Sequence, residues 1–99
     1  MAQFDVHRLR TGKGLVIDCQ SDLHRDLPTR LVVPLIGAED LSASHPRLAP
    51  RFTIGGESLV MATQFAATLP LRNLGEVVEK LGDQSHLVIG AIDALVTGV

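Results

Sequence analysis

Tryptophan and tyrosine are absent from the sequence, and three phenylalanines are its only aromatic residues. Without a row of aromatic side chains, a stacking platform for single-stranded nucleic acid is hard to build. Basic residues are not in excess either, because nine Lys and Arg stand against eleven Asp and Glu, which gives a formal net charge of −2. A protein that binds nucleic acid mainly through phosphates carries a strongly basic surface, so the sequence disfavours that class.

Cysteine is limited to Cys19, so no intramolecular disulfide can form and a small disulfide-rich secreted scaffold is excluded. The N-terminal sequence lacks a basic start followed by an apolar core, and we expect no signal peptide. The longest apolar stretch, residues 87–96, is about half the length that spans a bilayer. We therefore expect a soluble, cytoplasmic protein without membrane contact. A length of 99 residues predicts one domain over residues 1–99.

The first two-thirds of the sequence indicate short strands separated by turns. Period-two alternation predicts two half-buried strands near the N-terminus, with Asp5, His7 and Asp18 on their solvent faces. The polar segment 21–29 should be an exposed loop. Pro34 lies inside an otherwise continuous apolar run and indicates a sheet edge or a bulge. The expected strands are residues 3–9, 15–20, 30–36, 51–54, 57–63 and 66–71, and Gly55-Gly56 is a strong signal for a hairpin.

The last third of the sequence changes to a helical period. Leu74 and Leu81 bound a predicted first helix, and Asp83 is a plausible N-cap for a second one. The second helix is apolar nearly all round, because Ile89 and Val96 widen its apolar stripe. Such a helix is buried or partnered, which predicts a homodimer. The fold class is mainly β with α (α+β), which an SH3-like barrel with a C-terminal helix fits and other α+β folds also satisfy.

No group of side chains forms a convincing active site. Ser21, Asp22 and His24 are the residue types of a hydrolase triad, but three neighbours on one loop rarely converge. Asp18, Asp22 and Asp26 lack the spacing of a Ca²⁺ loop, and the four histidines lack metal-ligand spacing. Cys19 lies on the apolar face of its strand and is interpreted as a core residue. We expect no catalysis, no metal and no cofactor.

A resemblance supplies the function that the residue types alone do not. Short motifs that run along almost the whole chain, and whose order and spacing are specific, carry it. They are Gln3-Phe4-x-Val6, Asp18-x-Gln20-Ser21-Asp22, Arg30-Leu31-Val32-Val33-Pro34-Leu35, Ile54-Gly55-x-Glu57-Ser58, Gly75-Glu76-x-Val78 and Ala91-Ile92-x-x-Leu95-x-x-Gly98-Val99. With these motifs the chain resembles the CcdB family of bacterial toxins, the toxin half of a toxin–antitoxin pair.

The resemblance implies an SH3-like β-barrel with a small β wing and a C-terminal helix, assembled as a homodimer. It also implies a non-catalytic inhibitor that binds the A subunit of DNA gyrase, a topoisomerase, and traps the enzyme on cleaved DNA. A cognate antitoxin would neutralise it through a disordered C-terminal segment, and the two together would repress their own operon, with DNA contacted only through the antitoxin. The residues that match the family's gyrase-binding surface are Gln3, Phe4, Ser21, Gly98 and Val99. Two further positions of that surface carry Leu23, an aliphatic match to a family isoleucine, and Asp93, where the family has an asparagine.

The sequence departs from the family at Thr97, where the family has a tryptophan that stacks in the gyrase contact. Two alternatives to a gyrase inhibitor follow. One is a degenerate or retargeted toxin that binds antitoxin but not gyrase. The other is an endoribonuclease of the MazF type, which shares the barrel and would need a base and a cation that converge on RNA. His24 and Arg25 are its adjacent candidates, and Arg30 is a further cation that could touch RNA phosphate.

Overall fold

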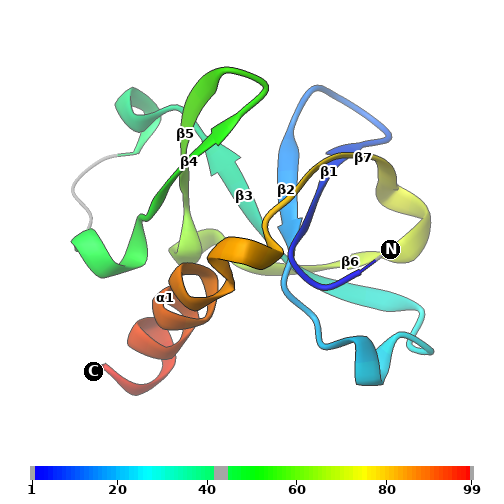
Figure 1. Ribbon diagram of the computed structural model, residues 1–99. Helices are drawn as coiled ribbons and strands as arrows, with labels where there is room; N and C mark the ends of the chain where they lie inside the picture. Colours follow the sequence, from blue (N-terminus) through cyan, green and yellow to red (C-terminus); the bar gives the residue numbers. More distant parts are fainter. Residues whose placement is uncertain (1, 42–44, 99) are drawn as a thin grey trace.

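The computed structural model describes residues 2–41 and 45–98. Within these residues seven strands form one antiparallel sheet that curls into a half-barrel (Figure 1). The strands are β1 (Asp5–Leu9), β2 (Leu15–Asp18), β3 (Thr29–Ile36), β4 (Arg51–Ile54), β5 (Glu57–Met61), β6 (Ala67–Pro70) and β7 (Leu74–Lys80). Their order is β4-β5-β3-β2-β1-β7, and β6 pairs with β3. With the helix α1 (Ser85–Thr97) after them, the expected α+β class and its SH3-like barrel are confirmed.

The β4–β5 hairpin forms as its sequence predicts. Gly55 and Gly56 have φ angles of 59° and 83°, a left-handed pair that a two-residue hairpin turn requires and that glycine adopts without strain. Phe52 and Ile54 are buried, whereas Arg51 alternates with them and is exposed. Local turn chemistry and period-two burial therefore agree along this hairpin.

Strand β3 lies in the middle of the sheet, so the expectation that Pro34 marks a sheet edge was wrong. One side of β3 pairs with β2, and its other side pairs first with β6 over Thr29–Val32 and then with β5 over Leu35–Ile36. Pro34 lies at the junction between these two partners, where its carbonyl accepts a hydrogen bond from the backbone of Ala62. A central strand tolerates the missing N–H because the ladder changes partner there.

Residues 74–80 form strand β7, and the predicted helix between Leu74 and Leu81 was wrong. β7 pairs with β1, and the register shifts twice along this pairing, between Val6 and His7 and between His7 and Leu9. Each shift changes which residues of the strand face the core, so the apolar residues no longer alternate with polar ones. Their spacing then resembles that of an amphipathic helix.

The solvent faces predicted for the first two strands are buried. Asp5, His7 and Asp18 are between 0% and 4% exposed. The sheet curls, and a second apolar cluster that includes Val16 and Leu74 lies apart from the main core. The face of these strands that the sequence assigned to solvent is therefore covered as well. The residues that the sequence assigned to water therefore lie inside the protein.

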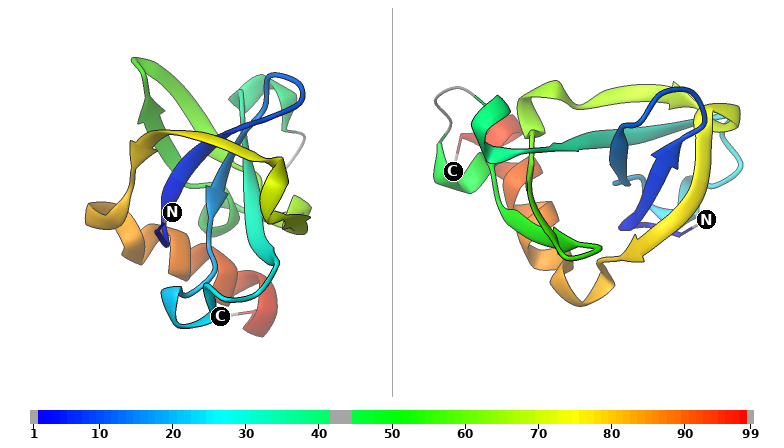
Figure 2. Two further views of the ribbon diagram at one scale, coloured as in Figure 1. Left: turned by 90° about the vertical axis from the view of Figure 1, so that its right-hand side faces the viewer. Right: turned by 90° about the horizontal axis from the view of Figure 1, so that it is seen from above.

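Helix α1 begins at Ser85, and Asp83 lies in the preceding 3-10 turn (Gly82–Gln84) instead of capping the helix. Its inner face buries Val88 and Ala91, and α1 packs against the short 3-10 turns Pro46–Leu48 and Thr63–Phe65 beside the sheet (Figure 2). The first of these turns begins with Pro46, because proline suits the first position of a helical turn.

Candidate partner-binding surface

Gln3 and Phe4 form an N-terminal turn that is tied to the loop after β2. Phe4 has a φ of 73°, a left-handed conformation that is uncommon for a residue with a side chain. Two backbone hydrogen bonds hold it, from Phe4 N to the Asp18 carbonyl at 2.6 Å and from Leu81 N to the Phe4 carbonyl at 3.0 Å. The Gln3 amide Nε2 donates to the Cys19 carbonyl at 3.1 Å. Strain of this kind persists only where the surroundings enforce it, so the turn is a fixed feature.

Ser21 and Leu23 lie on the loop between β2 and β3, beside this turn. Ser21 caps a 3-10 turn (Asp22–His24), and its Oγ accepts a hydrogen bond from Leu23 N at 3.2 Å. Gln20 closes the loop from both ends, because its side chain donates to the His24 carbonyl at 2.9 Å and accepts from Leu31 N at 3.0 Å. Leu23 is 89% exposed on this ordered support. A large apolar side chain in that position is available to a partner.

Asp18 and Arg30 form a buried ion pair beneath the loop. Arg30 Nη2 lies 2.7 Å from Asp18 Oδ2, its Nε lies 3.0 Å from the same oxygen, and the two side chains are 1% and 0% exposed. Arg30 is therefore unavailable to RNA phosphate, which corrects its assignment as a possible RNA contact. Asp18 is likewise unavailable as a metal ligand.

Asp93 and Gly98 lie near the C-terminal end of α1. Asp93 is exposed, and its carbonyl accepts a 2.6 Å hydrogen bond from Thr97 Oγ1. Gly98 has a φ of 77° and donates its N–H to the Ala94 carbonyl, which ends the helix in the left-handed conformation that favours glycine. Val99, the last of the predicted contact residues, lies outside the described residues.

The predicted contact residues thus form two groups in one chain. The first surrounds the N-terminal turn and the loop with Leu23, and the second lies at the end of α1. Figure 1 places the loop and the last turns of α1 on opposite sides of the molecule. The outer side of α1 continues the second group with exposed apolar residues: Ile89 is 47%, Leu95 44% and Val96 75% exposed.

The described chain matches the family model "CcdB protein" over residues 3–98. The chain belongs to the CcdB family. The match runs from the N-terminal turn to Gly98, so it includes every predicted contact residue except Val99. As a CcdB-family protein, the chain is a toxin of the toxin–antitoxin type.

Two of the residue types of a hydrolase triad make local hydrogen bonds in this loop. Ser21 Oγ accepts the backbone N–H of Leu23 as a cap, and Asp22 Oδ1 accepts the backbone N–H of Gln3 at 2.9 Å. Burial, and then the charge of Asp18, raise the pKa of the Cys19 thiol to about 12, which keeps it protonated and unreactive. Among the described residues, no three His, Cys, Asp or Glu side chains group as metal ligands.

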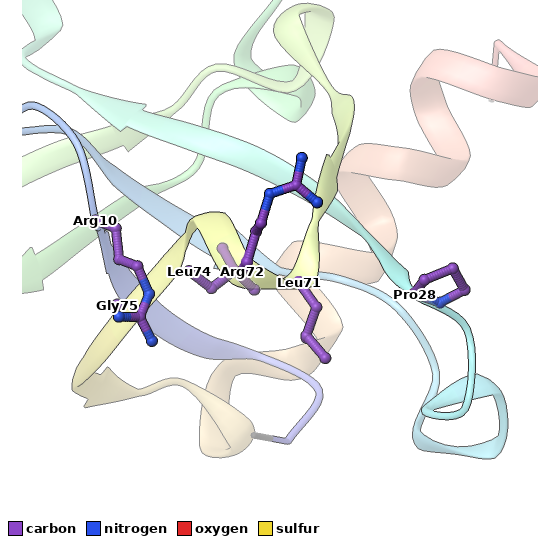
Figure 3. A pocket seen from close by; sticks show the side chains of 6 residues that line it. All are labelled: Arg10, Pro28, Leu71, Arg72, Leu74 and Gly75. Atoms are coloured by element: carbon purple, nitrogen blue, oxygen red, sulfur yellow. The ribbon is translucent and has the colours of Figure 1, made fainter.

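A pocket lies beside the start of β7 and the residues that precede β3. It is lined by Arg10, Pro28, Leu71, Arg72, Leu74 and Gly75. In Figure 3 the side chains of Arg10 and Arg72 point in opposite directions, so the two guanidinium groups do not converge on one anion. In the part of the chain that the structure describes, no helix has the length and apolarity needed to cross a membrane.

Sequence reasoning missed the interactions that hold the first group together. The buried pair Asp18–Arg30 and the bond from Gln3 N to Asp22 join residues far apart in sequence. The only signal was the pair of acidic residues on either side of Gln20, whose spacing does not fit a Ca²⁺ loop. Arg30 on the next strand neutralises one of them, Asp18.

Proposed function

We propose that this protein inhibits DNA gyrase by binding its A subunit, without catalysis of its own, and that a cognate antitoxin neutralises it in the bacterial cytoplasm. The observation that carries the proposal is Leu23, an apolar side chain 89% exposed on a hydrogen-bonded loop within a CcdB-family chain. An apolar residue presented on a rigid support loses little entropy when it binds.

The contact surface we propose consists of Gln3, Phe4, Ser21, Leu23, Asp93, Gly98 and Val99 on a single-domain protomer. We propose that two protomers form a homodimer through α1. Such a dimer would cover part of the exposed apolar face of this helix, where Leu95 and Val96 are 44% and 75% exposed. In a two-fold assembly, the helix end of one protomer could also join the loop of its partner in one surface. Together with the antitoxin, this dimer would repress its own operon.

A pair of matched substitutions tests the contact. Leu23→Ala removes the exposed side chain of the loop, and Val77→Ala removes a 39% exposed apolar side chain from β7, which lies outside the proposed surface. Calorimetric titration into the purified gyrase A subunit should give weaker binding for Leu23→Ala and unchanged binding for Val77→Ala. Equal affinity for both variants would contradict the proposed surface.

A second candidate is a toxin that keeps its antitoxin but has lost gyrase. The observation that favours it is Thr97, since a threonine offers far less contact area than the tryptophan of the family pattern. Titration of the native chain distinguishes the two candidates, because this second one predicts binding to the antitoxin segment and none to gyrase.

A further inference from the structure

The ion pair Asp18–Arg30 is buried, and burying two charged side chains costs free energy. Both partners lose their hydration, and the attraction between them rarely exceeds that loss by much. Apolar residues of similar volume would fill the same space at equal or higher stability. The geometry is nevertheless strong: Arg30 Nε lies 3.2 Å and 3.0 Å from the two Asp18 oxygens, and Nη2 adds a third bond at 2.7 Å. Stability alone does not explain such a pair.

The guanidinium of Arg30 reaches past Asp18 to the loop. Its Nη2 lies 3.5 Å from the Gln20 carbonyl oxygen and 4.0 Å from Asp22 Oδ1. Arg30 is 1% exposed, whereas the side chain of Asp22 is 49% exposed. One buried cation therefore faces a buried carboxylate on one side and the start of the loop on the other.

The Asp22 side chain lies between Arg30 and the N-terminal turn. The same oxygen that faces Arg30, Oδ1, accepts the backbone N–H of Gln3 at 2.9 Å. Gln3 is followed by Phe4, whose left-handed φ of 73° needs external support. The Asp18 backbone carbonyl supplies part of that support, because it accepts the Phe4 N–H at 2.6 Å. Arg30 thus lies behind Asp22, the side chain that joins the N-terminal turn to the loop.

We propose that Arg30 is a positioning residue for partner binding. It fixes the Asp22 carboxylate so that the N-terminal turn and the loop with Leu23 keep one relative placement, and it does so without touching the partner. This inference rests on the proposed function for its binding readout, but the positioning itself is measurable in the free protein. Held segments bind more tightly than mobile ones because less order is lost on binding.

The test uses a double variant that separates positioning from stability. Asp18→Leu with Arg30→Met replaces the ion pair by apolar side chains. We expect its thermal unfolding midpoint to equal or exceed that of the native chain. Hydrogen exchange of the Gln3 amide, followed by NMR, should nevertheless accelerate about tenfold, and gyrase affinity should fall by about the same factor, as expected for one lost hydrogen bond to a charged group.

A second pair of variants covers the case in which the double variant does not fold. Asp22→Ala removes the acceptor of the Gln3 N–H at the surface, and Asp26→Ala removes an exposed carboxylate from the same loop as its control. Asp22→Ala should accelerate exchange of the Gln3 amide and weaken gyrase binding, whereas Asp26→Ala should change neither.

The outcomes separate the two proposals. Native-like exchange of the Gln3 amide in both the double variant and Asp22→Ala would overturn the positioning role of Arg30. Accelerated exchange with unchanged gyrase affinity would also overturn it. If the native chain itself binds no gyrase, the proposed function fails, and accelerated exchange in the double variant still supports the placement of the turn by Arg30.

Discussion

Replacing Thr97 by tryptophan should convert a weak gyrase inhibitor into a strong one. Thr97 is exposed in the last turn of α1, directly before the Gly98 cap, so a larger side chain meets no packed neighbours in the core. The substitution removes the 2.6 Å bond from Thr97 Oγ1 to the Asp93 carbonyl. A threonine bond of this type within a helix adds little stability, so the fold should tolerate its loss.

The gain in binding follows from the area of the indole. An aromatic side chain buries about 150–250 Å², which at about 25 cal/mol per Å² is an upper bound of roughly 4–6 kcal/mol. Ordering the side chain and imperfect packing reduce this to roughly 2–4 kcal/mol, the usual range for an aromatic anchor. Affinity should therefore rise about 30-fold or more.

The assay is inhibition of supercoiling by purified gyrase, titrated with the native chain and each variant. Val77→Trp is the control, because it places the same indole on an exposed position of β7 that lies outside the proposed surface. Thr97→Trp should inhibit at much lower concentration than the native chain, and Val77→Trp should not. Equal inhibition by all three proteins would refute the reasoning that position 97 lies in the contact.

Further predictions concern stability, assembly and pH. Gly75→Ala should destabilise the fold by about 1–3 kcal/mol in denaturant unfolding, because the added Cβ would lie 2.6 Å from the Arg8 carbonyl oxygen, and an unchanged midpoint would refute the close approach of β7 to β1. Light scattering should give twice the 10.6 kDa of one chain, and a monomer at micromolar concentration would contradict the homodimer. Native Cys19 should resist a thiol reagent until the protein is unfolded, and fast native labelling would contradict its burial. Burial raises the pKa of Cys19 to about 12 from an ordinary value of 9.0, so the contribution of the protonated thiol to folding stability should be complete below pH 9. This contribution should be lost as the pH rises from 9 to 12, so the free energy of unfolding should fall less steeply over this range in Cys19→Ala than in the native chain.

The elements that the sequence predicts well are those that local chemistry determines. The β4–β5 hairpin follows from Gly55-Gly56 and from alternating burial on either side. The extent of α1 follows from its apolar period, although its N-cap does not. The prediction for β7 was wrong because two register shifts in its pairing with β1 break the period-two pattern of its sequence. These shifts are visible only in the pairing of the two strands.

The residues around the candidate surface also differ in how well the sequence predicts them. Burial of Cys19 was predictable from the apolar face of β2. The fates of Asp18 and Arg30 were not, because a charged residue on an alternating strand normally faces water. Their burial depends on how the sheet curls and on a partner twelve residues away, which no local pattern contains.

Trapping of cleaved DNA by gyrase tests the central claim most directly. Purified gyrase and supercoiled plasmid are incubated with the native chain at high micromolar concentration, and with Thr97→Trp, before detergent and protease treatment. The account predicts linear DNA that depends on both gyrase and the added chain, with more from Thr97→Trp than from the native chain. No linear DNA from either protein, in an assay where a known gyrase poison produces it, would contradict the account and point to a toxin with another target.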